Sequence, residues 1–161
     1  MEFTLQQARP EHIPQISAIW EAGWHEAHGK ITPPALTRLR TSQSFLDRSG
    51  EYLSRTRVAV SGAEVHGFCM VKSDELYQMY VASTARGTGI AQALIADAEA
   101  TIRAAGHPKA WLSCAIGNEQ ARRFYEKSGW LNAGEQVVNM DTQKGPFPLT
   151  IWQFEKVLRG A

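Results

Sequence analysis

The feature that most constrains the fold is a short segment in which a β-rich run passes through two glycines into an amphipathic helix. The run Leu76–Val81 leads to the turn Arg86-Gly87-Thr88-Gly89. An apolar stripe at helical spacing follows, made of Ile90, Leu94, Ile95, Ala98 and Ile102. Glycine accepts backbone angles closed to other residues and leaves no side chain in the way. The segment therefore predicts a strand, turn and helix whose N–H groups can converge on an anion such as phosphate.

This turn differs from two familiar phosphate-binding motifs. The dinucleotide motif G-x-G-x-x-G fails because Gln92 and Ala93 stand where a further glycine is needed, and no G-K-[ST] follows. An ordinary glycine-rich connection between strand and helix is the alternative interpretation. The turn can bind an anion, with Arg86 adding positive charge, but it is of another type.

The rest of the chain predicts an α/β (α+β) fold with a mixed, mostly antiparallel sheet of about seven strands flanked by about four helices. The expected strands are residues 3–8, 57–60, 65–71, 76–81, 110–115, 135–140 and 149–157. The expected helices begin at Pro10, at Thr32-Pro33 (running irregularly to about Ser54), at Ile90 and after Asn118. No repeat or long linker divides the sequence, so we expect a single domain over residues 1–161.

Composition narrows the function classes. Seventeen Lys and Arg against sixteen Asp and Glu give a formal net charge of +1, which lacks the strong basic field of a nucleic-acid binder. No basic leader or membrane-spanning apolar run is visible, so we expect a soluble cytoplasmic protein without a membrane partner. Cys69 and Cys114 lie in apolar runs and are interpreted as reduced core residues.

Two sequence blocks give the chain a specific resemblance. Arg86-Gly87-Thr88-Gly89-Ile90-Ala91 resembles the Q/R-x-x-G-x-G/A signature of the GNAT superfamily of acetyl-CoA-dependent N-acyltransferases. Residues 118–130, NEQARRFYEKSGW, are similar to that family's N-x-x-A-x-x-F-Y-x-K-x-G-F segment and depart from it only at Trp130. The resemblance is sharp from about Glu75 to Trp130 and weaker toward the amino terminus. It implies the family's fold and its cofactor, acetyl-CoA.

The resemblance also implies which residues hold the donor. The backbone amides of the turn, Arg86, Gly87, Thr88, Gly89, Ile90 and Ala91, are expected to bind the pyrophosphate of coenzyme A. Backbone groups of Met79 and Val81 are expected to align the pantetheine arm and the thioester. Asn118 is expected both to cap its helix and to contact the cofactor arm. Arg122, Arg123 and Lys127 either meet the 3′-phosphate or form a solvated helix face.

Two residues are candidates for proton transfer. Tyr125 matches the family tyrosine that faces the coenzyme sulfur, which implies a general acid, although a tyrosine beside Phe124 at helical spacing also suits a core position. Glu75 lies at the spacing where some members of the superfamily keep a general base. The alternative is that Glu75 is a solvated residue at the start of a strand and that water acts as the base.

The acceptor side is less defined by the sequence. Trp24, His25 and His28 lie in the region that borders the amine site in the resembling family, and surface helix positions are the alternative. A metal is not expected, because H-E-x-H lacks the i, i+4 histidine spacing of a zinc helix.

The resemblance therefore implies an N-acetyltransferase that moves an acetyl group from acetyl-CoA to a primary amine by direct attack in a ternary complex. The acceptor is a small-molecule or peptide amine whose identity the sequence leaves open. The alternative is a non-catalytic acyl-CoA-binding sensor of the same fold. A covalent route through Cys114 is disfavoured because no histidine partner is apparent. A homodimer is a further expectation, since the last strands of this family often form dimers.

Overall fold

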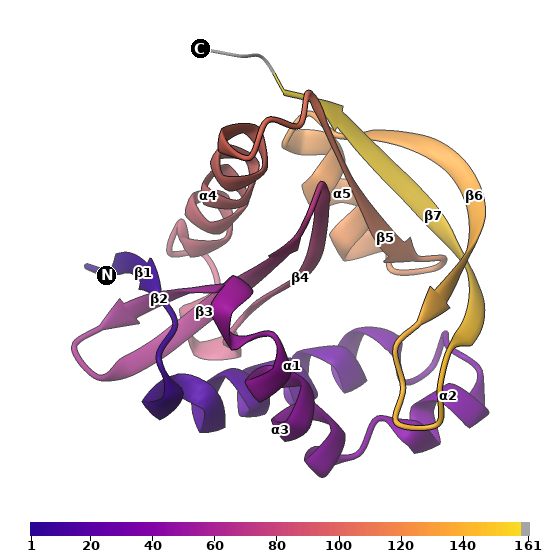
Figure 1. Cartoon of the computed structure of the whole chain (residues 1–161), viewed down its shortest axis with the longest axis horizontal. Coiled ribbons are helices and arrows are strands. Elements are labelled where there is room, and N and C mark those ends of the chain that lie inside the picture. Colours follow the sequence, from indigo (N-terminus) through magenta and orange to yellow (C-terminus); the bar gives the residue numbers. More distant parts are fainter. Residues whose placement is uncertain (159–161) are drawn as a thin grey trace.

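One seven-stranded sheet organises the chain in the computed structural model, which describes residues 1–158 (Figure 1). The strand order is β1-β2-β3-β4-β5-β7-β6, and every neighbouring pair is antiparallel except β4 with β5. The strands are β1 (Thr4–Gln7), β2 (Thr56–Ser61), β3 (Glu64–Lys72), β4 (Glu75–Val81), β5 (Lys109–Ala115), β6 (Leu131–Met140) and β7 (Phe147–Val157). The predicted mixed, mostly antiparallel sheet is confirmed.

Helices cover both faces of this sheet (Figure 1). One face carries helices from the first third of the chain, and the other carries the two later helices. The first group is α1 (Ile13–His28), α2 (Pro34–Leu39) and α3 (Ser42–Glu51), and the second is α4 (Ile90–Ala104) and α5 (Glu119–Lys127). Short 3-10 turns lie at Pro10–His12, Leu53–Arg55 and Ser83–Ala85.

The expected second helical region is two helices, so the described residues form five α-helices. Arg40 leaves the helical conformation, with φ −87° and ψ 65°. Thr41 then starts α3, because its side chain accepts a hydrogen bond from the backbone N–H of Ser44 at 3.2 Å. The break places Arg40 between two helices.

The ends of α4 and α5 follow from residues that the sequence marks. Gly89 precedes α4 with φ +88°, a left-handed conformation that strongly favours glycine. Asn118 caps α5 by accepting from the N–H of Ala121 at 3.2 Å, which confirms its predicted capping role. Gly129, with φ +89°, follows the end of α5 as expected.

The two halves of the sheet separate between β4 and β5. These parallel strands share a single registered pair, Glu75 with Trp111, near the start of β4. The Nε1 of Trp111 donates to the Asp74 carboxylate at 3.0 Å and fixes this junction. Beyond it the strands diverge (Figure 1), so the later part of β4 has a free edge toward β5.

The strand register is irregular at three places, one of which lies between β2 and β3 at Ala59 and Val60. In β4 an extra residue, Tyr77, lies between the pairs Val71–Leu76 and Met70–Gln78. In β6 the pairing is irregular between Asn132 and Glu135 and includes Gly134 at φ +105°. The strand expected from Glu135 therefore begins earlier, at Leu131, because the glycine turn is a bulge within the strand.

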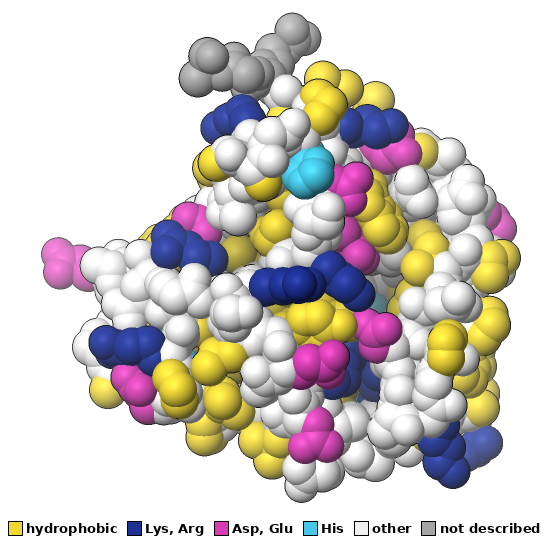
Figure 2. All heavy atoms as spheres, in the orientation of Figure 1, with side chains coloured by type: hydrophobic (Ala, Val, Ile, Leu, Met, Phe, Trp, Pro, Cys, Tyr) yellow, Lys and Arg dark blue, Asp and Glu magenta, His cyan; other side chains and the backbone are white. Residues whose placement is uncertain are grey.

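Two apolar clusters fill the space on either side of the sheet. The first joins the sheet to α4 and includes Cys69 and Cys114, which are buried and unpaired, as predicted. The second joins it to α1 and α3 around Trp20 and Phe45. The face shown in Figure 2 has Lys and Arg interspersed with Asp and Glu. No helix within residues 1–158 combines the length and apolar character needed to cross a bilayer.

Candidate active site

A cavity of about 700 Å³ lies where β4 and β5 diverge. Its lining comes from α1, β4, the turn after β4, β5, α5 and the β6–β7 pair. The cavity brings together the two predicted catalytic residues and the donor-binding residues predicted in β4, the turn, α4 and at Asn118: Glu75, Met79, Val81, Arg86, Gly87, Thr88, Gly89, Ile90, Ala91, Asn118 and Tyr125. Arg122, Arg123 and Lys127, the alternative contacts of the 3′-phosphate, are not among its lining residues. We call residues 86–91 the turn end of this cavity. Arg40, Arg48 and Lys72, which also line it, form its basic end.

The turn end is built from backbone. Gly87 and Gly89 have φ of +76° and +88°, and a Cβ at either position would meet no atom within 4 Å. These glycines are therefore needed for their conformation and leave open space above the turn. The first-turn N–H groups of α4 have no acceptor inside the helix and carry its positive end. The turn end can thus hold an anion with backbone donors.

The Arg86 side chain points to a partner on α1. Its Nη2 pairs with the Glu26 carboxylate at 2.8 Å, and both side chains are about half exposed. The Arg86 hydrogen bond and charge lower the pKa of Glu26. The positive charge expected to reinforce the anion site is therefore engaged by a neighbouring carboxylate.

Met79 and Val81 lie on the part of β4 that β5 leaves unpaired. Their partners in β3 are Cys69 and Gly67. The opposite edge of β4 faces the divergence from β5, where the cavity lies. The backbone groups on that edge are free to bind an extended ligand.

Tyr125 both packs in the core and lines the cavity. Its ring centroid lies 5.8 Å from that of Phe154 and 6.3 Å from that of Trp130. Its hydroxyl makes no hydrogen bond to another group of residues 1–158. Burial, and then the nearby Cys114 and Tyr80, raise the pKa of this phenol above its ordinary value. Tyr125 therefore keeps its proton at neutral pH, and its hydroxyl is available to a ligand.

Glu75 is a partly buried carboxylate at the start of β4. Burial raises its pKa, Lys72 opposes the shift, and Asp141 and Asp74 add to it; together these effects bring the pKa to about 7. A carboxylate with a pKa near neutrality is suited to accept a proton at neutral pH. Glu75 is thus only partly exposed at the start of β4 and lines the cavity.

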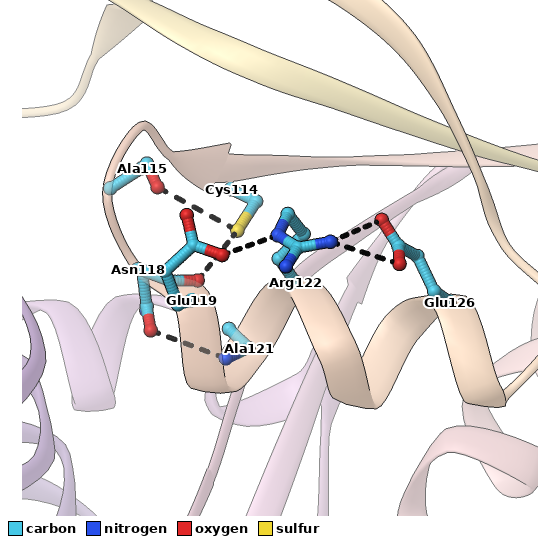
Figure 3. Close-up of polar contacts among 7 residues, drawn as sticks. All are labelled: Cys114, Ala115, Asn118, Glu119, Ala121, Arg122 and Glu126. Carbon is cyan, nitrogen blue, oxygen red and sulfur yellow. Dashed lines mark hydrogen bonds and ion pairs between the residues drawn. The ribbon is translucent and has the colours of Figure 1, made fainter.

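Figure 3 shows the hydrogen bonds and ion pairs along α5 and at its N-terminus. The Cys114 Sγ lies 3.9 Å from the carbonyl oxygen of Asn118, and burial raises the pKa of the thiol to about 12. Arg122 binds the carboxylates of Glu119 and Glu126, the latter at 3.0 Å. The thiol is thus protonated and inert, and Arg122 forms ion pairs along its own helix face.

Of the three residues predicted for the acceptor side, two line the cavity and one does not. Trp24 and His28 line the cavity, whereas His25 does not. The Nε2 of His25 is 2.9 Å from the Arg40 carbonyl oxygen. Burial lowers the pKa of His28 to about 4, so His28 is neutral at physiological pH. Within residues 1–158 no group of three or more His, Cys, Asp or Glu side chains is placed to hold a metal ion.

The sequence analysis missed the residues of the basic end and their neighbours. Arg40 Nη1 donates to the Asp141 carbonyl oxygen at 2.6 Å, and Arg48 Nη2 donates to Tyr77 Oη at 3.1 Å. The Asp141 carboxylate accepts from Tyr77 at 2.7 Å and lies 3.7 Å from Lys72 Nζ. These partners come from distant segments, so no local pattern marks them.

Gly23 is a further missed residue, and here a signal was present. A Cβ at this position would lie 2.5 Å from Cδ1 of Tyr80, so a side chain would force the tyrosine to move. Gly23 lies inside α1, where glycine lowers helix stability relative to alanine. A glycine inside a helical pattern can therefore indicate a close approach by another element.

Comparisons with known proteins agree with this architecture. The family model described as "Acetyltransferase (GNAT) family" matches residues 13–130. An uncharacterized N-acetyltransferase of Mycobacterium tuberculosis is 33% identical over 123 residues, which cover 67% of this chain and 78% of the relative. The chain belongs to the GNAT family of acetyltransferases.

Solved structures show the same fold at low sequence identity. A GCN5-related N-acetyltransferase from Rhodopseudomonas palustris has a TM-score of 0.75 at 19% identity, covering 98% of this chain and 97% of that one. PaiA N-acetyltransferase from Thermoplasma acidophilum, solved in complex with coenzyme A, has a TM-score of 0.67 at 17% identity over 98% and 99% of the two chains.

Proposed function

We propose that this GNAT acetyltransferase moves the acetyl group of acetyl-CoA to a primary amine by direct attack in a ternary complex. One observation carries the proposal: the turn end, Tyr125 and Glu75 all line the same cavity. A donor and an acceptor bound there together would meet beside both proton-transfer groups. The PaiA structure with coenzyme A supports the choice of donor class.

The turn end fits the pyrophosphate of the donor. The first-turn N–H groups of α4 and the open space over Gly87 and Gly89 suit a group with several oxygen acceptors and negative charge. The free edge of β4 at Met79 and Val81 suits the amide-containing pantetheine arm. Asn118 lines the cavity beside this path, although its side-chain oxygen already caps α5.

The proposed reaction assigns one proton to each of two side chains. Glu75, with a pKa of about 7, accepts a proton from the ammonium form of the acceptor and leaves a neutral amine. The amine nitrogen attacks the thioester carbonyl carbon, and the carbon–sulfur bond then breaks as Tyr125 gives its proton to the departing thiolate. The nitrogen that has attacked still carries one proton too many, and it releases this proton through solvent to the Tyr125 phenolate, which restores the phenol. Glu75 returns its own proton to solvent. The products are the N-acetylated amine and free coenzyme A.

A titration coupled to a thiol assay tests this proposal. We expect acetyl-CoA to bind in calorimetry, and we expect free thiol to appear only after a panel of primary amines is added. Mass spectrometry of the products then identifies the acetylated amine. Binding with no thiol release from any amine would favour the sensor alternative, and absence of binding would refute the donor site.

A further inference from the structure

We propose that the acceptor amine also carries a carboxylate, and that Arg40 and Arg48 bind this carboxylate at the basic end of the cavity. The inference rests on the proposed acetyl transfer and names its acceptor class, a small zwitterionic amine such as an amino acid. It concerns the end of the cavity that the sequence motifs do not describe.

The first argument is the burial of two cationic side chains that lack full hydrogen bonding. Arg40 is 4% exposed and Arg48 is 8% exposed, and both line the cavity. The Nε of Arg40, and the Nε and Nη1 of Arg48, have no hydrogen-bond partner within residues 1–158. Charged groups this deeply buried are normally paired with an opposite charge.

The second argument is that neither guanidinium has a carboxylate as its hydrogen-bond partner. Arg40 donates to the backbone oxygen of Asp141, and Arg48 donates to the hydroxyl of Tyr77. The Arg48 guanidinium also lies 4.3 Å from the centre of the Trp20 ring. Burial and then the charge of Arg48 lower the pKa of Arg40 to about 10, and the nearby Asp141 opposes this shift only in part. An anion placed against both arginines would stabilise their charged forms further.

The third argument is the placement of opposite charges in the cavity. Three cations, Arg40, Arg48 and Lys72, line it together with two carboxylates, those of Asp141 and Glu75. Asp141 is 3.7 Å from Lys72 Nζ. A ligand carboxylate at the arginines and a ligand ammonium group at Glu75 would each lie beside a group of opposite charge, so a zwitterion complements the site.

The fourth argument is that hydrogen bonds hold the segment that carries Arg40 in a fixed position. Gln143 Nε2, in the segment after β6, donates to Leu39 O at 2.8 Å. Arg40 Nη1 donates to the Asp141 carbonyl oxygen at 2.6 Å, and Tyr52 Oη donates to the Asp141 carboxylate at 2.9 Å. These bonds join the segment after β6 to the α2–α3 region and so position Arg40 for a ligand.

The test compares matched amines on the wild-type protein. Thiol release from acetyl-CoA is measured with leucine against leucinamide, with 4-aminobutyrate against butylamine, and with phosphoethanolamine, and rates are expressed per unprotonated amine. We expect at least one carboxylated amine to exceed its neutral match in kcat/KM by about 100-fold, because the neutral ligand leaves buried charges unpaired. Equal or faster reaction of the neutral amines would overturn the inference while leaving acetyl transfer intact. Preference for phosphoethanolamine would also overturn the carboxylate assignment.

Variants then localise the effect. Arg48→Met and Arg40→Met should raise KM for the carboxylated amine by about 10-fold or more and leave the Kd for acetyl-CoA unchanged. The matched control Arg38→Gln, exposed on α2, should change neither quantity. An unchanged KM in both Met variants would refute the role of the arginines. If a Met variant fails to bind acetyl-CoA because it is unfolded, the wild-type comparison still decides.

Discussion

The turn end of the cavity comes from one continuous stretch of chain, whereas the basic end combines separate segments and includes Arg40, whose hydrogen-bond partner Asp141 lies 101 residues away in the sequence. Residues 86–91 follow β4 directly and offer backbone donors fixed by two glycines. Arg40, Arg48 and Lys72 offer side chains whose partners lie in β4 and after β6. Backbone binding at one end suits an invariant donor, and side-chain binding at the other suits a particular acceptor.

The largest effect should come from Tyr125, the proposed acid in the cavity. We expect Tyr125→Phe to lower kcat by about 100-fold, the usual contribution of a general acid, while the Kd for acetyl-CoA stays within about two-fold. The substitution keeps the aromatic ring, which preserves the contacts with Phe154 and Trp130. Rapid-quench kinetics and calorimetry measure the two quantities. An unchanged kcat across pH would remove the acid role.

Gly89→Val should damage the turn end alone. Its φ of +88° is costly for a β-branched residue, by about 2 kcal/mol, so we expect acetyl-CoA affinity to fall roughly 30-fold. Gly62→Val is the matched control, because Gly62 has φ +60° and open space around it but lies in the β2–β3 turn. The control should lose stability and keep its affinity. Equal affinity loss in both variants would mean that general strain, rather than the turn, is responsible.

Glu75→Gln should change the pH profile. With a pKa of about 7, Glu75 ionises as pH rises through neutrality, so wild-type kcat/KM should rise up to that pH and then level. In the variant, kcat/KM should no longer show this rise with pH, and the rate at pH 8 should be about 10-fold lower than in the wild type. Retention of the rise would assign the proton to water.

The same carboxylate predicts a pH dependence of stability. The native pKa of Glu75 lies above its ordinary value of 4.5, so the folded state holds the proton more tightly than the unfolded state. Its contribution to the free energy of unfolding is therefore present below about pH 4.5 and falls as pH rises toward 7. Urea titrations of wild type and Glu75→Gln at several pH values should show this slope in the wild type only.

Gly23→Ala tests whether the position of the Tyr80 side chain in the cavity affects acceptor binding. The added Cβ, 2.5 Å from the Tyr80 ring, must displace it, and we expect acceptor KM to rise about three-fold and stability to fall by about 1 kcal/mol. Gly50→Ala in α3 is the control, since its Cβ would meet only Ile13 Cδ1 at 4.0 Å. That variant should gain about 0.5 to 1 kcal/mol. Similar kinetics in both variants would show that the position of Tyr80 is unimportant.

The smallest effect is expected at Arg86. Its guanidinium is paired with Glu26 and about half exposed, so Arg86→Gln should weaken acetyl-CoA binding only about two-fold. Calorimetry at low and high salt measures the Kd of the variant and of the wild type for acetyl-CoA. A loss of ten-fold or more would show that the side chain leaves Glu26 to bind the donor.

The contrast between the ends also explains what the sequence could predict. Gly87, Gly89 and Asn118 act on neighbours within a few residues, so their patterns predict the turn, α4 and the cap of α5. Arg40 and Arg48 gain their environment only when α2, α3, β4 and the segment after β6 come together, and sequence periodicity does not report such contacts. The bulge at Tyr77 was missed for the same reason.

The central claim is that both substrates meet in one cavity and react directly, and a two-substrate initial-velocity study tests it. Rates are measured over a grid of acetyl-CoA and amine concentrations, with intact-mass analysis of the protein after exposure to acetyl-CoA alone. We predict intersecting double-reciprocal lines and an unmodified protein, because burial raises the pKa of the Cys114 thiol to about 12. Parallel lines with an acetyl group on Cys114 would contradict the account.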